Sequence, residues 1–264
     1  MLRSLQFLAS SSQGNAAVLS TDQSRILIDA GLSGKQILQH LAYYSLHIQD
    51  IDAVFLSHEH SDHTQGIRGL ASFRHLQFFA NHATKHALQA KHDYAIHWQN
   101  FDTGDSFVFR DIAVTTHAIP HDAEDPIAYT FSSTAEQEQR LSWMTDLGYI
   151  SPSLNSLIRD TRVLVLEANF DPGLLESDLS RPWSLKQRIR GRHGHLSNTA
   201  ALNGLCEQVP TRAQKVFLAH LSRDCNDPKI LIGLIAEARK QHPLLPPDIE
   251  PIAPGSALGI QYLF

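Results

Sequence analysis

A short segment rich in histidine carries the side chains best suited to chemistry. Residues 57–63 read Ser-His-Glu-His-Ser-Asp-His, in a chain that holds 16 histidines. His58 and His60 are two residues apart, so in an extended segment their side chains point to the same side and can bind one ion. Asp62 and His63 follow where the chain turns toward a helix, and they can face a second ion. Because neutral imidazoles and carboxylates suit Zn(II), Mn(II) or Fe(II), the segment predicts a metal site rather than a solvated polar turn.

The elements around this segment must hold it in place. A buried strand is predicted over Asp52–Leu56 and a helix over Gly66–Phe73. Upstream, a helix is expected over Ser33–Tyr43, with Ser33 as its N-cap and with Ile37, Leu38 and Leu41 on one face. Three short apolar runs separated by turn residues come before it and predict a β-meander: Ser4–Ala9, Ala16–Ser20 and Arg25–Ile28.

Downstream, strands and helices continue to the end of the chain. The expected strands are Leu76–Ala80, Asp111–Ile119, Pro126–Ser132, Leu141–Thr145, Val163–Ala168, Lys215–Ala219 and, after a proline-rich stretch over Pro243–Pro254, Gly259–Leu263. The expected helices are Ala83–Lys91, Ser151–Arg159, Trp183–Gly191, Ser197–Val209 and Pro228–Gln241. This order predicts two sheets packed together with helices outside. Because no repeat or linker interrupts it, we expect a single domain over residues 1–264.

Composition narrows the class of protein. A chain of 264 residues can bury a large core without a metal, so a bound metal is expected to serve chemistry. The net charge of −5 argues against a surface wholly devoted to nucleic acid, although it leaves room for a local basic patch. The two cysteines, Cys206 and Cys225, form no Cys-x-x-Cys pair, which favours a reducing compartment. Without a signal-peptide core or a run long enough to span a membrane, the protein is expected to be cytoplasmic and to have no membrane partner.

The histidine segment and its surroundings resemble those of a known family. The His-x-His-x-Asp-His string after a buried strand resembles the signature of the metallo-β-lactamase-fold hydrolases, and an ordered set of segments resembles the YycJ/WalJ subgroup over nearly the whole length. Besides the histidine cluster, these segments are Leu8–Asn15, Leu27–Ser33, Pro120–Pro126, Thr145–Tyr149, Glu167–Asn169, Gly194–Asn198 and His220–Ser222. Ser11 and Ala128 stand where the pattern would have glycines, which affects loop geometry but no ligand.

The resemblance implies a four-layer αββα sandwich, an α/β fold with metals at one edge of its two sheets. It implies two divalent ions, zinc or manganese with iron also possible. One would be bound by His58, His60 and His121, the other by Asp62, His63 and His220, with Asp146 bridging the pair. The predicted strands support this, since His121, Asp146 and His220 each lie just beyond a strand end. His117 remains the alternative to His121 as a metal ligand. Asp29 is expected either to support the metal ligands from behind or to serve only the fold.

A basic run near residue 190 bears on the substrate. Arg181, Lys186, Arg188, Arg190 and Arg192 lead into Ser197 and Asn198, at the start of a predicted helix. The run is either a solvated helix face or a phosphate-binding edge, and a helix start favours an anion. The expected phosphate-binding residues are His195, Ser197, Asn198, Arg188 and Arg190. The resemblance points the same way, because the subgroup is associated with exonuclease action on DNA.

Three functions follow from these residues. The leading hypothesis is a dinuclear phosphodiesterase, a DNA exonuclease with a hydroxide held between the metals as nucleophile. Its catalytic residues would be Asp62, Asp146 and His195, with His195 protonating the leaving group. The alternative is a small-molecule hydrolase of the thioesterase or lactamase type, in which the basic run is incidental. A non-catalytic binding module is the third, but it would have lost ligands that this chain retains.

Overall fold

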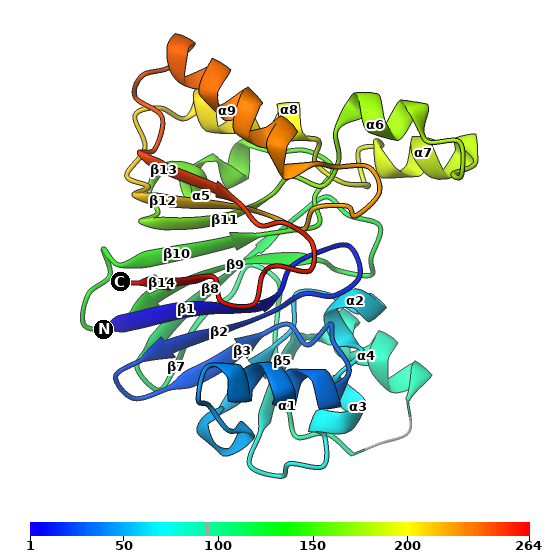
Figure 1. The fold of residues 1–264 in the computed structure, drawn as a ribbon. Coiled ribbons are helices and arrows are strands. Elements are labelled where there is room, and N and C mark those ends of the chain that lie inside the picture. Colours follow the sequence, from blue (N-terminus) through cyan, green and yellow to red (C-terminus); the bar gives the residue numbers. More distant parts are fainter. Residues whose placement is uncertain (93–94) are drawn as a thin grey trace.

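The computed structural model describes residues 1–92 and 95–264 and contains two seven-stranded sheets (Figure 1). The first sheet runs in the order β14 (Gln261–Leu263), β1 (Leu2–Ala9), β2 (Ala16–Thr21), β3 (Arg25–Ile28), β4 (Ala53–Phe55), β5 (Gln77–Asn81) and β6 (Trp98–Phe101). The second runs β13 (Asp248–Pro251), β12 (Lys215–Ala219), β11 (Val163–Glu167), β10 (Arg140–Met144), β9 (Ile127–Ser133), β8 (Ile112–Ala118) and β7 (Ser106–Phe109). The last strand thus pairs with the first along the chain.

Helices cover the outer face of each sheet, which completes the predicted αββα sandwich (Figure 1). Beside the first sheet lie α1 (Gly34–Tyr43), α2 (Ser61–Thr64), α3 (Ile67–Leu70) and α4 (His82–Lys91). Beside the second lie α5 (Asn155–Arg159), α6 (Pro172–Ser177), α7 (Trp183–Ile189), α8 (Asn198–Glu207) and α9 (Pro228–Gln241).

Strands that are apolar on both faces explain the layering. In β11, Val163 and Val165 pack between the sheets, whereas Leu164 and Leu166 pack under the helices of the second sheet. Because side chains alternate across a strand, such a strand is stable only with both faces covered. The central layer contains residues of both sheets, including Phe7, Phe55, Tyr129, Trp143 and Phe217.

Several sequence expectations need correction here. β13 lies within the proline-rich stretch, where no strand was expected; as an edge strand it tolerates Pro251, which has no N–H to donate. β6 and α6 were also not predicted. The predicted helix over Gly66–Phe73 is shorter, Ile67–Leu70, and is preceded by α2. Leu38 is 37% exposed, so it does not share the buried face of Ile37 and Leu41.

The single domain remains a prediction. In the described residues no helix is long and apolar enough to cross a membrane.

Candidate metal centre

Loops that follow strands of both sheets carry the predicted ligands to one edge of the sandwich. The segment 57–63 follows β4, and His60 is the N-cap of α2, which places Asp62 in its first turn. Asp146 is the second residue after β10 and His220 the first after β12, and their φ values are left-handed, 63° and 58°. Such backbone costs about 1–3 kcal/mol for a residue other than glycine and tends to persist where it positions a functional side chain.

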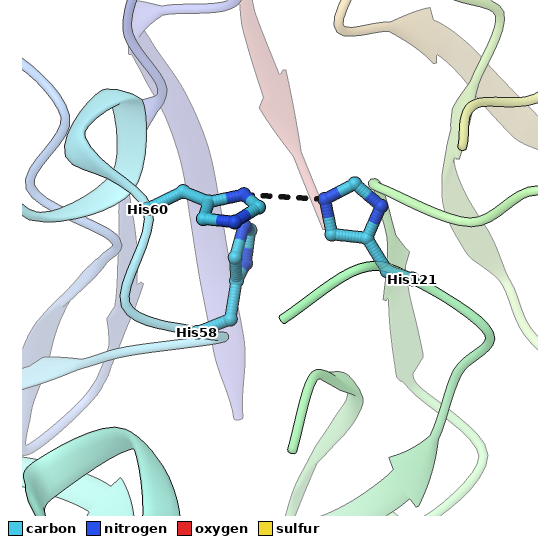
Figure 2. Close-up of side chains that lie close together, drawn as sticks. All are labelled: His58, His60 and His121. Atoms are coloured by element: carbon cyan, nitrogen blue, oxygen red, sulfur yellow. Dashed lines mark hydrogen bonds between the residues drawn. The ribbon is translucent and has the colours of Figure 1, made fainter. Parts of the chain in front are cut away.

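Three histidines form the first cluster (Figure 2). The ring centroids of His58 and His60 are 4.7 Å apart, and those of His58 and His121 are 5.2 Å apart. His60 Nδ1 and His121 Nε2 are separated by 3.3 Å. One nitrogen from each of the three residues lies within 4.8 Å of the others, a spacing at which three imidazoles can converge on one ion.

Asp62, His63, Asp146 and His220 form the second cluster. His220 Nε2 lies 3.3 Å from Asp62 Oδ2 and 3.4 Å from Asp146 Oδ1. His63 Nε2 lies 3.1 Å from Asp146 Oδ2. The other oxygen of Asp146 is also 3.8 Å from His121 Nε2, in the first cluster. The carboxylate of Asp146 therefore lies between the two clusters, where the resemblance implies a bridging ligand.

Buried acceptors behind the histidines fix the orientation of their rings. Asp29 is fully buried, and its Oδ2 accepts a hydrogen bond from His63 Nδ1 at 2.8 Å. The carbonyl of Gly194 accepts one from His121 Nδ1 at 3.0 Å. With Nδ1 protonated, the Nε2 lone pair of each ring is free to face a metal. Asp29 therefore contacts a predicted ligand, His63, from behind, which agrees with the supporting role.

Glu167 is a site residue that the sequence reasoning missed. Its Oε1 accepts hydrogen bonds from His220 Nδ1 at 2.8 Å and from His195 Nδ1 at 2.9 Å. Its Oε2 accepts from the backbone N–H groups of Leu147 and Leu196. The signal in the sequence was a carboxylate at the end of the apolar strand β11, because an acidic side chain is rarely fully buried without partners.

Opposite charges at the site shift the pKa values of its side chains. Burial alone would lower the pKa of His220, but Asp146, Asp62 and Glu167 outweigh it and raise the pKa to about 10. Burial would raise the pKa of Glu167, but His195 and His220 lower it to about 2. The carboxylates thus stay ionised at neutral pH. Burial and His63 both lower the pKa of His58, which keeps that imidazole neutral, the form that binds a metal.

Two buried atoms of the site have no hydrogen-bond partner among the described residues, and a bound metal would supply a partner. His58 Nε2 and Asp146 Oδ2 are buried and accept no hydrogen bond from any described residue. An unsatisfied buried polar group costs about 1–3 kcal/mol, and both atoms belong to the clusters described above. The residues present therefore fit a divalent metal centre. His117 does not belong to it: its Nε2 is 3.1 Å from Thr130 Oγ1, in a separate cavity beside β9.

A pocket of about 170 Å³ opens onto both clusters. Its walls include five of the predicted ligands and also His195, Arg188 and Leu185. Of the phosphate-binding residues that the sequence predicted, His195 and Arg188 therefore lie at the pocket.

The other three predicted phosphate-binding residues do not line the pocket. Asn198 is fully buried and its side chain pairs with Asn226, so its prediction was wrong. Ser197 Oγ is the N-cap of α8 and accepts from the N–H of Ala200. Arg190 stacks on Trp183 at 4.4 Å and pairs with Glu176 at 3.2 Å.

Acidic partners neutralise much of the basic run. Arg181 pairs with Asp178 and Asp224, and Arg188 pairs with Asp122. Lys186 is buried and donates to the carbonyl of Glu176. The run is therefore not a continuous free positive surface, and Arg188 shares its charge with Asp122.

Comparison with known proteins identifies the family. The model of the Beta-lactamase superfamily domain matches residues 24–221. The chain belongs to this superfamily. It is 34% identical over 221 residues to the exodeoxyribonuclease YycJ of Bacillus anthracis, covering 83% of this chain and 82% of that protein. It is 35% identical over 224 residues to the exodeoxyribonuclease WalJ of Streptococcus pneumoniae, covering 83% and 81%. The chain is thus a YycJ/WalJ-like member and a metal-dependent hydrolase.

Solved structures agree on the fold. The metallo-β-lactamase-fold protein YhfI of Bacillus subtilis superposes with a TM-score of 0.74 at 16% identity, covering 100% of both chains. A diphosphatase of the PhnP family gives 0.69 at 17% identity, covering 100% of this chain and 98% of that one. At this identity the likeness supports the metallo-β-lactamase fold and nothing finer.

Metal binding should stabilise the folded protein measurably. A ligand at 100 times its Kd adds about 2.7 kcal/mol to the free energy of unfolding, which in a chain of this size raises Tm by roughly 5–10 °C. Differential scanning fluorimetry of metal-stripped protein, with and without Mn(II) or Zn(II), measures the rise. His121→Ala should reduce it and His117→Ala should retain it; the reverse result would make His117 the ligand.

Proposed function

We propose that the protein is a dinuclear metal-dependent phosphodiesterase that degrades DNA from an end. The main support is the position of the Asp146 carboxylate between two clusters of candidate ligands. Asp146 lines the same pocket as His195 and Arg188. The relatives named exodeoxyribonucleases support the choice of DNA.

Each ligand cluster would hold one ion. His58, His60 and His121 would bind the first ion, and the second would be bound by Asp62, His63 and His220, with Asp146 shared. When bound, two such ions, zinc or manganese with iron possible, activate water as hydroxide and stabilise negative charge on substrate oxygens. The residues behind them, Asp29 and Glu167, keep the ligand rings in place.

His195 is placed to donate a proton to the leaving group. Its Nδ1 is bonded to Glu167, so Nε2 is the ring nitrogen left for a substrate, and the side chain lines the pocket. Burial would lower the pKa of His195, but the Glu167 carboxylate outweighs burial and raises it. A raised pKa favours the protonated ring, which can transfer its proton to the departing oxygen of a phosphodiester.

Arg188 is the residue placed to bind a neighbouring phosphate. Arg188→Ala should lower kcat/KM on single-stranded DNA about tenfold and reduce its dependence on salt, because a phosphate contact is lost. Arg190→Ala is the matched control: it removes the same charge from the same helical region, but Arg190 lies away from the pocket. Equal effects of the two substitutions would mean that the run acts through overall charge alone.

A panel of substrates tests the function. Purified protein with Mn(II) or Zn(II) should shorten linear DNA and leave closed circular DNA intact, because an exonuclease needs an end. Cutting of the circle would indicate an endonuclease. Turnover of a thioester or lactam without turnover of any DNA would support the small-molecule alternative.

A further inference from the structure

A second cavity is lined by sequence neighbours of residues that line the metal pocket. It has a volume of about 190 Å³ and lies between the β1–β2 loop, α1 and the segment before β14. In Figure 1 the blue β1–β2 connection and the red segment before β14 lie at the same end of the first sheet. The cavity contains no predicted metal ligand.

Two loops form the wall between the cavity and the metal pocket. Ser12 and His220 line the metal pocket, whereas Ser11, Gln13 and Arg223 line the cavity. The N–H of His220 donates to Ser10 Oγ at 2.9 Å, which holds the two loops together. Consecutive residues of the β1–β2 loop therefore line the two cavities, Ser12 on one side and Ser11 and Gln13 on the other.

The lining of the cavity combines apolar surfaces with a polar edge. Leu8, Leu32 and Leu258 supply apolar atoms, and the side chain of Gln36 lies at the rim. His40 Nδ1 donates to the carbonyl of Leu8 at 2.9 Å, so Nε2 is the ring nitrogen left for a ligand. A nucleobase has the matching chemistry, since its faces are apolar and its edge forms hydrogen bonds.

Arg223 gives the cavity an uncompensated positive charge. It is exposed, and within the described residues it has no carboxylate partner, in contrast to Arg181, Arg188 and Arg190. It lies three residues beyond His220 on the loop that separates the two cavities. A phosphate next to the one at the metals would meet this guanidinium.

The β1–β2 loop is held in shape before any ligand arrives. Asn15 Oδ1 accepts from the N–H of Ser11, and Asn15 Nδ2 donates to the carbonyl of the same residue. The N–H of Gly14 also donates to the carbonyl of Ser11, at 3.1 Å. Because a preformed loop loses little conformational entropy on binding, this wall of the cavity is suited to recognition.

We propose that this cavity binds the base of the nucleotide adjoining the scissile phosphodiester and that Arg223 contacts the phosphate of that nucleotide. The inference rests on the proposed function and assigns a second substrate subsite to it.

The test compares DNA with a phosphodiester that lacks a base. For each variant we would measure kcat/KM on a single-stranded oligonucleotide and on bis(p-nitrophenyl) phosphate, and take the ratio of the two. Arg223→Ala should lower the ratio about tenfold and reduce the salt slope on DNA by about 0.7, the value for one lost contact with single-stranded nucleic acid. Arg74→Ala removes an exposed arginine that lines neither cavity and should leave the ratio unchanged.

Abasic oligonucleotides test the cavity itself. In the wild type, removal of the base at one position near the cleaved end should lower kcat/KM about tenfold. Leu258→Trp, which fills the cavity, should abolish that dependence, whereas the similarly sized Leu258→Met should keep it. Two results would overturn the subsite alone. One is a wild-type protein whose cleavage of DNA is unaffected by removal of the base at any position. The other is an unchanged ratio of kcat/KM values in Arg223→Ala. Absence of DNA cleavage by the wild type would overturn the proposed function as well.

Discussion

Asp146→Asn is expected to lower phosphodiester hydrolysis on the order of a thousandfold. Asparagine has the same shape, but it replaces one carboxylate oxygen by an amide NH₂ that cannot bind a cation. In the structure the two oxygens of Asp146 face His63 on one side and His121 and His220 on the other. The loss should therefore appear on every substrate and be accompanied by a lower metal content, measured by mass spectrometry of the dialysed protein.

A surface carboxylate provides the control for this substitution. Asp248→Asn changes an exposed side chain on the edge strand β13 that pairs with Lys215, and it should keep both activity and metal content. Circular dichroism should show both variants folded. If folded Asp146→Asn hydrolysed DNA at the wild-type rate, a bridging role for this carboxylate would be wrong.

Glu167→Gln is expected to lower DNA hydrolysis about a hundredfold, the upper range for loss of a residue that orients metal ligands. Both Glu167 oxygens accept two hydrogen bonds each, and an amide nitrogen cannot accept them. The substitution would release His195, the proposed proton donor, and His220, a proposed ligand.

The leaving group separates these two consequences of Glu167→Gln. A sugar alkoxide needs a proton as it departs, whereas p-nitrophenolate is stable without one. If His195 is the proton donor, the loss should be several-fold greater on DNA than on bis(p-nitrophenyl) phosphate. An equal loss on both substrates, with reduced metal content, would mean that Glu167 acts only through His220. Glu250→Gln, on the edge strand β13, is the control.

The clustering of the candidate ligands in residues 58–63 could be predicted because their geometry is local. His58, His60, Asp62 and His63 lie in six consecutive residues after one strand, so strand and turn geometry alone brings them together. The distant ligands needed the resemblance, since nothing local to His121 distinguishes it from His117. The difference between them is tertiary: the ring of His121 is held by the carbonyl of Gly194, 73 residues away.

The errors share a physical cause, namely partners that are distant in the sequence. Asn198 was expected to face a phosphate because it opens a helix, but Asn226 draws its side chain into the interior. The basic run could not reveal that Arg188 pairs with Asp122 or Arg190 with Glu176. Glu167 went unrecognised because its four hydrogen bonds come from residues 20 to 53 positions away.

Metal titration against DNA hydrolysis shows whether the two clusters hold the ions that cleave DNA. Protein stripped with EDTA would be titrated with Mn(II) or Zn(II) while the shortening of end-labelled single-stranded and duplex DNA is followed. We expect no hydrolysis without metal, stepwise shortening from one end once metal is added, and saturation at two ions per chain. Hydrolysis that persists in the stripped protein, or a metal-saturated protein that leaves all DNA intact, would contradict this expectation.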